Sequence, residues 1–313
     1  MSTTTRPLPP EPQITASSWI MVGILGFVWG STFMLIEIAL EGFTPFWLAA
    51  GRLIMATAVT GLYWLRLRCP LALDPQNKPT ILQYFWTGAV AAGIPFLLLS
   101  WGQLHVTSGF AGTSMAAVPL VVLPLAHFLV PGEGLTLRKT LGVSMGFIGV
   151  ILLLGGNTLE SSGSELEFWG RVACLTVAVC YALNSVTIRR LPPVDPIGLT
   201  FMMMAAATVM TLPVAILVEG APPQPNSRAW LAFIAIGVVS TAAMNLLRVL
   251  VIRSAGPSFM TLTNYQVPVW SVVLGSLVLA EPLPPALLWA LLLILSGVAI
   301  SQWNTLKRLW QRS

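Results

Sequence analysis

The chain has 313 residues, of which 56% are hydrophobic and only 9% are charged. Soluble domains carry about a quarter charged residues, so this composition excludes a water-soluble globular protein. The formal net charge is +5, and the basic residues behind it follow the loops of a membrane protein, so the charge gives no support to nucleic-acid binding.

Residues 1–17 precede the first apolar run and are rich in Pro, Thr and Ser. This composition predicts a disordered cytoplasmic tail. The run that follows, from Ser18 to Leu40, is longer than the apolar core of roughly 7–15 residues that a signal peptide has. We therefore expect it to be the first permanent transmembrane helix.

Apolar runs long enough to cross a membrane recur along the rest of the chain. A hydrocarbon core of ~30 Å requires about 20 helical residues. Ten runs meet this requirement, at residues 18–40, 45–66, 81–101, 106–130, 138–156, 168–189, 196–219, 229–252, 257–280 and 285–304. The sequence therefore predicts an all-α integral membrane protein with ten transmembrane helices, which leaves 305–313 as a second cytoplasmic tail.

The basic residues are distributed unevenly between the loops of this ten-span scheme. With both termini in the cytoplasm, Arg171 and Arg228 lie outside, and Arg52 and Arg248 fall within spans. The other twelve lie inside, namely Arg6, Arg66, Arg68, Lys78, Arg138, Lys139, Arg189, Arg190, Arg253, Lys307, Arg308 and Arg312. Such an excess of cytoplasmic Lys and Arg indicates a multi-pass protein with both termini inside.

Cysteine and histidine residues are too few and too scattered for a metal site or a disulfide framework. The chain has three Cys and two His, and none of them has the spacing of metal ligands. The Gly-rich phosphate loop and the motifs GxSxG and HExxH do not occur either. We therefore expect no metal, no cofactor, no ATP-driven step and no enzymatic activity.

Two segments of the chain repeat the same order of Pro, Glu and Gly at nearly equal spacing. They run from Pro119 through Glu133 to Gly149 and from Pro268 through Glu281 to Gly297. Prolines also open the second and seventh spans, at positions 45 and 196, where proline suits the first helical turn. Each half, 18–156 and 168–304, thus carries five spans, and an odd number inverts the second half relative to the first. Inverted repeats are typical of secondary transporters, whose substrate site lies where the halves meet; an old duplication that now serves packing alone is the alternative.

Four stretches of the sequence also resemble a known family. They are WGSTF in the first span, LAAGRL in the second, and the related pair PLVVLPLAHFLVPGEGLT and PVWSVVLGSLVLAEPLP. In this order, within a ten-span chain, they resemble the EamA-type members of the drug/metabolite transporter superfamily. The resemblance covers residues 18–304 and implies a ten-helix bundle of two EamA-type repeats in a bacterial inner membrane. It also implies export or facilitated passage of small metabolites such as amino acids. The second half has Met203 where the first has Arg52, so that arginine has no two-fold counterpart.

Glu37 and Arg52 are ionisable residues within the first two predicted spans, where a lone charge costs at least ~2.5–3.5 kcal/mol. The short connection EGFTP makes these helices neighbours in sequence, so the two charges could pair near the outer membrane surface. One interpretation is a structural ion pair, and the other makes Glu37 part of a gate or proton relay. Arg248 lies near the inner end of its span and is expected to reach the interface. A helix-capping or loop-fixing role is expected for Glu133 and Glu281.

Uncharged polar and aromatic residues within the spans are the candidates for substrate binding. A buried amide without a partner costs about 2–7 kcal/mol, and a polar substrate would supply the partner. A hydrogen bond between helices is the alternative role for each of them. The candidates are Trp29, Ser31, Thr32, Ser100, Trp101, Gln103, Tyr181, Asn184, Asn245, Asn264, Tyr265 and Gln266.

Prolines and glycines indicate where the bundle bends and where it packs. Pro119 and Pro268 occupy matching places in the fourth and ninth spans, where proline favours a kink, and they are the candidate hinges. The pairs Gly26–Gly30 and Gly142–Gly146 are GxxxG motifs. We expect them to pack helices within the chain rather than between chains.

These observations predict a transporter that exports or equilibrates small metabolites, amino acids above all, by alternating access at a central cavity between the repeats. Its expected partners are the lipid bilayer and a small-molecule substrate. The main alternative is a multidrug or cation exporter, but such a pump needs a carboxylate at the membrane midplane and Glu37 lies nearer the rim. A non-transporting membrane scaffold is a weaker alternative. The substrate, the coupling ion and the oligomeric state stay open, and ten spans are enough for a monomer.

Overall fold

The computed structural model describes residues 14–71, 73, 77–129, 136–155, 165–255, 257–303 and 307. Every regular element in these ranges is a helix, which agrees with the predicted all-α class. Most of the two predicted tails, 1–17 and 305–313, and the predicted cap Glu133 lie outside the described residues.

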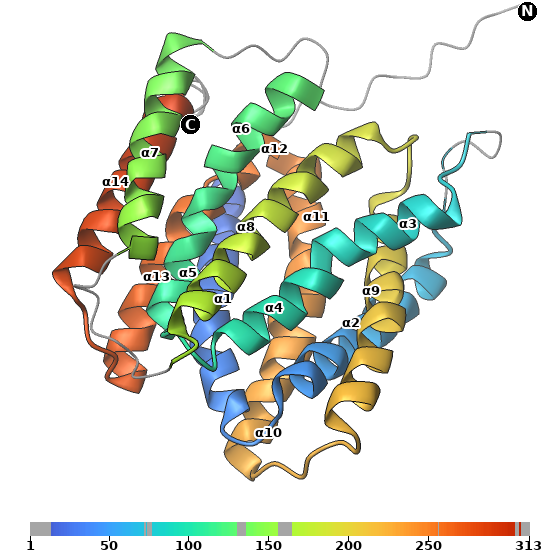
Figure 1. The fold of residues 1–313 in the computed structure, drawn as a ribbon. Helices are drawn as coiled ribbons and strands as arrows, with labels where there is room; N and C mark the ends of the chain where they lie inside the picture. Colours follow the sequence, from blue (N-terminus) through green and yellow to red (C-terminus); the bar gives the residue numbers. More distant parts are fainter. Residues whose placement is uncertain are drawn as a thin grey trace, which may run out of the picture.

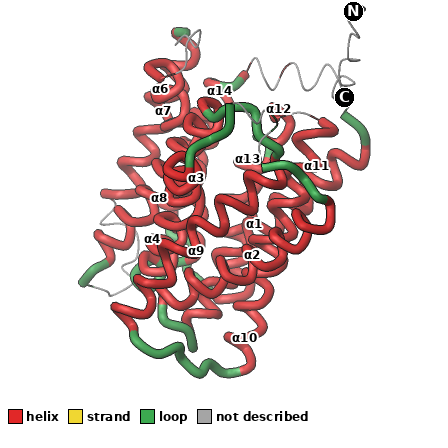
Figure 2. Tube along the Cα trace, turned by 90° about the vertical axis from the view of Figure 1, so that its right-hand side faces the viewer, coloured by secondary structure: helices red, strands yellow, loops and turns green. Residues whose placement is uncertain are grey.

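The helices follow one another in two series along the chain (Figure 1). The first series is α1 (Ala16–Leu40), α2 (Pro45–Leu67), α3 (Ile81–Gly88), η1 (Ala89–Gly93), α4 (Ile94–Gly102), α5 (Ser108–Ser114), η2 (Met115–Ala117), α6 (Val118–Leu129) and α7 (Leu137–Gly155). The second is α8 (Glu167–Arg190), α9 (Pro196–Glu219), α10 (Ser227–Ile234), η3 (Ala235–Ala243), α11 (Met244–Ala255), α12 (Pro257–Met260), α13 (Thr263–Leu279) and α14 (Pro285–Ser301). Figure 2 shows the helices side by side, with loops gathered mainly toward the ends of the bundle.

Eight helical segments are long and apolar enough to cross a membrane, judged by length and composition. They are Ala16–Leu40, Pro45–Leu67, Ile81–Gly102, Ser108–Phe128, Leu137–Leu154, Glu167–Ile188, Pro196–Glu219 and Ser227–Ile252. The predicted ninth span is divided into α12 and α13 by a turn at residues 261–262. The predicted tenth span is the shorter apolar helix Pro285–Ser301. Eight of the ten predicted spans are therefore found as long apolar segments.

Several helices begin at the residues that the sequence predicts, and local sequence signals explain these starting points. Pro45 and Pro196 each lie in the first turn of their helices, α2 and α9, where a missing backbone N–H costs nothing. Thr80 and Gln83 form a capping box at the start of α3, in which each side chain accepts from the other residue's backbone N–H. The beginnings of these three helices are thus encoded locally.

Two glutamates of the second half cap helices of the first half. Glu219, the last residue of α9, accepts from the Phe46 and Trp47 backbone N–H groups of α2 at 3.0 and 2.9 Å. Glu281 accepts from the first two N–H groups of α5 at 2.8 and 3.0 Å, which confirms its predicted capping role. The end of α9 therefore meets the start of α2, and the end of α13 meets the start of α5. Both helix pairs run antiparallel.

The two halves contact each other as copies related by an approximate two-fold axis. Thr57 of α2 and Thr208 of α9 are 151 positions apart, and their hydroxyls form a hydrogen bond of 2.9 Å. Pro45 and Pro196 have the same separation. A residue that bonds to its own counterpart must lie on the axis that relates the copies. The packing of whole helices agrees, since α1 on α13 is matched by α8 on α6, and η3 on α2 by η1 on α9.

The same relation holds where α7 packs against α14, at the edge of the bundle (Figure 1). In the repeat, Gly149 matches Gly297 and Gly142 matches Ala290. A methyl group at Gly142 would clash with the Gly297 carbonyl, and one at Gly149 would lie 3.0 Å from the Ala290 carbonyl. The contact between Gly142 and Gly297 and the contact between Gly149 and Ala290 are thus related to each other by the two-fold axis.

A π-helical segment interrupts the same span of each half. η1 begins eight residues after the start of α3, and η3 begins eight residues after the start of α10. π-helical segments are rare and occur frequently at functional sites, because the wider turn frees backbone carbonyls from the regular ladder. Their repeated position marks the third and eighth spans as places where the helix geometry is adapted.

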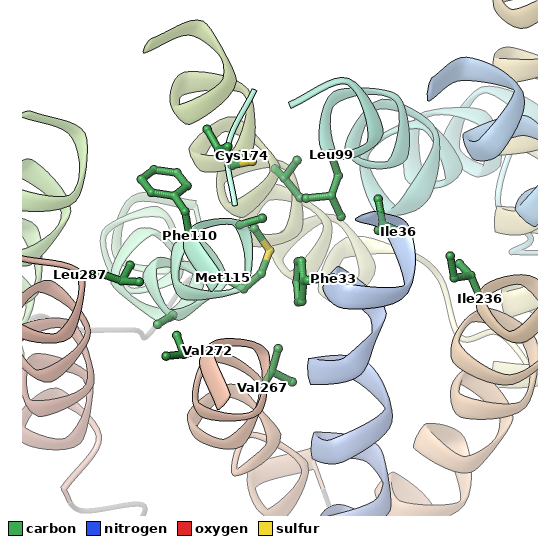
Figure 3. Packing of buried hydrophobic residues seen from close by; sticks show 14 of the residues in the cluster. Phe33, Ile36, Leu99, Phe110, Met115, Cys174, Ile236, Val267, Val272 and Leu287 are labelled. Carbon is green, nitrogen blue, oxygen red and sulfur yellow. The ribbon is translucent and has the colours of Figure 1, made fainter. Parts of the chain in front are cut away.

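Buried apolar residues of both halves form one large cluster (Figure 3). Its members include Phe33 of α1, Leu99 of α4, Met115 of η2, Cys174 of α8 and Val267 of α13. The partly buried rings of Trp29 and Tyr181, two of the predicted substrate-binding residues, pack against this cluster. The candidate site therefore borders the core in which the halves meet.

The GxxxG pairs pack helices within the chain, as predicted. A methyl group at Gly30 would clash with Trp270 and lie 3.0 Å from the Val267 carbonyl, so the α13 backbone rests directly on α1. Gly26, one turn earlier, lies against the Gln266 side chain. Close approach of this kind requires a residue without a side chain.

Candidate substrate site

Arg52 of α2 reaches across the bundle to the eighth span. Its guanidinium donates from Nε and Nη2 to the Thr241 hydroxyl of η3, at 3.3 and 3.1 Å, and lies 3.7 Å from the centre of the Phe96 ring. The side chain is only 4% exposed, and its Nη1 has no hydrogen-bond partner among the described residues. An aromatic face attracts a cation but does not neutralise it. Arg52 is thus held in a fixed orientation, while its Nη1 donor lacks a partner.

The π-helical geometry of η3 positions the groups around Arg52. Thr241 donates to the Ile236 carbonyl, five residues back along the chain, at 2.8 Å. The Ser240 carbonyl accepts from the Trp29 indole of α1 at 3.1 Å, and the Asn245 amide donates to the Thr241 carbonyl at 2.6 Å. Carbonyls of the widened turn are therefore satisfied by side chains.

Tyr181 of α8 is the ionisable neighbour of both Arg52 and Arg248. Arg248 of α11 thus lies inside the bundle beside a tyrosine, whereas the sequence predicted that it reaches the membrane interface. Tyr181 and Arg248 both keep part of their surface accessible. In the described part of the chain, neither arginine forms an ion pair with a carboxylate. Three helices therefore bring two arginines to one tyrosine without a balancing negative charge.

The structure does not bring Glu37 and Arg52 together as an ion pair. The neighbours of Glu37 are Gln103, Glu281 and Glu41, and its Oε2 atom has no hydrogen-bond partner in the described ranges. The reason is that the eighth span packs against both α1 and α2. Its segment η3 takes the Trp29 indole from one side and the Arg52 guanidinium from the other.

Several predicted candidates use their polar groups within their own surroundings. Ser31 and Thr32 donate to the Val28 carbonyl, each at 2.9 Å, a common way for a helix to satisfy its own hydroxyls. Trp101 packs edge-on against His105, with ring centres 4.8 Å apart. These three side chains thus have partners on their own helix or in the turn that follows it.

Other candidates carry buried polar atoms without a partner in the described residues. Gln103 is 1% exposed and donates to the Phe33 carbonyl at 2.8 Å, while its Oε1 has none. The Ser100 hydroxyl, the Asn184 Oδ1 and the Tyr265 hydroxyl are in the same condition. Asn184 follows Tyr181 by one turn of α8, so both lie on similar sides of that helix. Asn264 and Gln266 are partly buried neighbours of Tyr265 in α13.

The two predicted hinge prolines differ in their distance from irregular backbone. Pro119 is the second residue of α6 and directly follows the 3-10 turn η2, which lies within the four residues before a proline that its ring disturbs. Pro268 lies inside α13, and the turn at residues 261–262 that separates α13 from α12 is too far back to be an effect of its ring.

Thr241, Ser240 and Phe96 are site residues that sequence reasoning missed. Thr241 is 189 positions from Arg52 along the chain, and a threonine in an apolar run has many ordinary roles. The one available signal was the repeat itself, which places the third and eighth spans opposite each other. Among the described residues, no group of three or more His, Cys, Asp or Glu side chains could hold a metal ion.

Comparison with known proteins agrees with this architecture. The model of the EamA-like transporter family matches residues 17–155 and 168–303, one match for each half. The chain belongs to the EamA-like transporter family. This EamA-like chain is therefore a membrane transporter, and the predicted resemblance is confirmed.

Three similar proteins are also named as transporters or exporters. The chain is 30% identical to the "Uncharacterized inner membrane transporter YedA" of Escherichia coli K12, over 80% of this chain and 79% of that protein. It is 26% identical to the "Probable terminal-alkyne amino-acid exporter" of Streptantibioticus cattleyicolor, over 95% and 96%. It is 24% identical to the "S-adenosylmethionine/S-adenosylhomocysteine transporter" of Chlamydia trachomatis serovar L2, over 86% and 84%. The EamA-like chain is thus a multi-pass protein of the inner membrane.

A solved crystal structure supports the fold. It superposes with a TM-score of 0.64 at 22% sequence identity, over 95% of this chain and 99% of that chain. At this identity the likeness extends to the arrangement of the helices in the EamA-like fold and no further.

Proposed function

We propose that the protein carries small metabolites, amino acids first among them, through a central cavity between two inverted five-helix repeats, by alternating access. The observation that carries this proposal is the polar cluster in which Arg52 of the first repeat meets Thr241 of the second. Substrate sites of inverted-repeat transporters lie at that kind of junction. The partial exposure of Tyr181 and Arg248 inside the bundle supports a cavity beside this cluster.

The proposed topology has ten membrane crossings and both termini in the cytoplasm. The antiparallel course of α2 and α9 supports it, since these helices open the second and seventh spans. The hydrogen bond between Thr57 and Thr208 on the axis supports the inversion of the second half. The excess of basic residues in the loops that face inward supports the orientation.

The moving parts in this proposal are the irregular segments of matching spans. The π-helical segments η1 and η3 and the breaks before Pro119 and Pro268 occur in both halves. Segments with fewer regular backbone hydrogen bonds bend at lower cost. Rocking one half against the other about them would open the cavity to each side in turn.

Glu37 is the proposed gate or proton relay. It lies beside Gln103 and near Glu281, and its Oε2 lacks a partner in the described residues. A carboxyl group without a cationic partner inside a membrane protein is suited to take up and release a proton.

Proteoliposomes that contain the full chain provide the test of transport and of this role. We expect uptake of labelled amino acids, and accumulation under an imposed pH gradient that is lost in Glu37→Gln. Glu41→Gln is the matched control, because Glu41 lies one turn away in an exposed pair with Arg228. Equilibration without accumulation would reduce Glu37 to a structural role. No uptake by correctly folded protein would overturn the amino-acid proposal, and uptake of cationic drugs alone would favour the multidrug alternative.

Replacement of the polar cluster distinguishes a transporter from a membrane scaffold. Thr241→Val removes the hydroxyl that orients Arg52 and leaves the apolar surface of the bundle unchanged. A transporter loses rate in this variant, whereas a scaffold keeps its phenotype.

A further inference from the structure

We propose that Arg52, Tyr181 and Arg248 form a binding site for the carboxylate of an organic anion, and that the protein selects such anions over cations. This inference rests on the proposed transport function, since it places the substrate at the junction of the two repeats. It goes further by assigning the charge that the substrate carries there.

The positive charge of the two arginines is unbalanced. Charged groups inside a protein are normally paired, because transfer out of water is costly and a partner offsets that cost. Arg52 has one hydroxyl and one aromatic ring as partners, and its buried Nη1 has none among the described residues. Arg248 has no ion pair in those residues either. Two guanidinium groups near one tyrosine leave a local excess of positive charge that a bound anion would balance.

The donor groups of Arg52 are held in a fixed geometry. Thr241 and Phe96 hold the Arg52 guanidinium by its Nε–Nη2 side and by its face, and the buried Nη1 has no partner among the described residues. Guanidinium groups present paired donors that match the two oxygens of a carboxylate. The Tyr181 hydroxyl, which neighbours both arginines, can add a third donor. This donor set is suited to a carboxylate.

The groups also lie at related depths in the bundle. The Arg52 guanidinium bonds to Thr241, which is fourteen residues from the start of its span, and Tyr181 is fourteen residues from the start of α8. In the proposed topology these two spans run in the same direction, so at 1.5 Å per residue both positions lie about 21 Å along their helices. Arg248 follows Thr241 by seven residues, about 10 Å further along the span, and its long side chain approaches the site from the cytoplasmic side.

Three carboxylates of the described residues have other surroundings. Glu37 has Gln103, Glu281 and Glu41 as its neighbours, while Glu219 and Glu281 are occupied as helix caps. A cationic substrate would meet two like charges at the arginine site, which is unfavourable in a medium of low dielectric constant. Selection against cations follows from the same residues as selection for anions.

Binding to the purified full chain in detergent tests the site. The probes are a matched trio of carboxylate, amide and amine, namely propionate, propionamide and propylamine. Affinity is read from isothermal titration calorimetry. We expect the carboxylate to bind at least about tenfold more tightly than the matched amide, because a hydrogen bond to a charged group contributes a free energy of about that size. The amine should not bind. Equal affinity within the trio, or binding of chloride as tight as that of the carboxylate, would overturn the proposal.

Variants connect the selectivity to the named residues. Arg248→Gln and Arg52→Gln should each weaken carboxylate binding by about tenfold or more, and Arg248→Lys should retain part of it. Arg228→Gln is the matched control, because Arg228 is an exposed arginine paired with Glu41, and it should bind as the parent does. Tyr181→Phe keeps the ring and tests the hydroxyl if an arginine variant fails to fold. Carboxylate binding that is unchanged in folded Arg248→Gln and Tyr181→Phe contradicts the assignment.

Uptake measured in parallel separates this inference from the transport proposal. Selective carboxylate binding without uptake would leave the site in place and overturn transport. Uptake of amides or amines that is unaffected by Arg248→Gln would leave transport in place and overturn the anion site.

Discussion

The third and eighth spans have matching backbones and different chemistry. Their π-helical segments begin at the same distance from the start of each span, but η1 has five residues and η3 has nine. η1 consists of Ala, Val and Gly, whereas η3 contains Thr241, whose hydroxyl accepts from Arg52, and Ser240, whose backbone carbonyl accepts from the Trp29 indole. The repeated backbone supplies a scaffold with two irregular places, and the polar groups of one of them define the candidate site.

The other site residues follow the same rule. Arg52 has the apolar counterpart Met203 in the second half. Tyr181 occupies the place in α8 that Gly30 occupies in α1, as the starts of the two helices show. Gly30 admits the backbone of α13, while Tyr181 interacts electrostatically with Arg52 and Arg248. The halves are thus alike where they pack and different where they are polar.

The largest expected effect concerns packing at one of these matched positions. In Gly30→Val the new side chain would collide with Trp270 and with the Val267 backbone, which cannot move aside as a flexible side chain could. Overpacking of this kind costs about 1–3 kcal/mol, and we expect the upper end of that range. Thermal unfolding of the detergent-solubilised protein measures it. Gly23→Val is the control, since nothing lies within 4 Å of a methyl group there, and equal destabilisation by both variants would refute the close packing of α1 on α13.

A smaller effect is expected where the second half caps the first. Glu219→Gln weakens the hydrogen bonds to the Phe46 and Trp47 N–H groups and removes a negative charge from the start of α2. Loss of such a cap costs about 1–2 kcal/mol. Glu41→Gln, which breaks a pair of 3.3 Å whose side chains are 61% and 41% exposed, should cost less than about 1 kcal/mol. A larger loss in Glu41→Gln than in Glu219→Gln, in thermal unfolding at low salt, would reverse our ranking.

The features that the sequence predicted are those that depend on short stretches of chain. Apolar length and composition identify the long helices, and the proline positions identify the starts of α2 and α9. The capping role of Glu281 and the internal packing of Gly26 and Gly30 were predictable because carboxylates after spans and GxxxG pairs have few common roles.

The features that the sequence did not predict depend on which distant spans become neighbours. The short turn between α1 and α2 suggested that Glu37 meets Arg52, but the eighth span packs against both helices and takes Arg52 to Thr241. The distance of Arg248 from the end of its helix predicted an arginine at the membrane interface. Its interaction with Tyr181 depends on the position of α8, which the local sequence does not show. The contact between Arg52 and Thr241 joins residues almost 200 positions apart, and no pattern in the apolar sequence around either residue predicts it.

The smallest expected effect lies on the two-fold axis, where symmetry is closest and still incomplete. Thr208 donates its hydroxyl hydrogen to the Met204 carbonyl at 2.9 Å, so Thr57 must be the donor in the bond between them. Thr208→Val would leave a hydroxyl donor without its acceptor, whereas Thr57→Val would leave only a free lone pair, so the first should destabilise more. A double-mutant cycle with the two valine variants should give a coupling of ~0.6 kcal/mol. Identical costs for the single variants would show that the bond reverses its direction freely, and zero coupling would show that the pair does not hold the halves together. A hydrogen bond between two equivalent hydroxyls has one donor and one acceptor at any instant. The two halves of this duplicated fold therefore differ even at the residues on the axis.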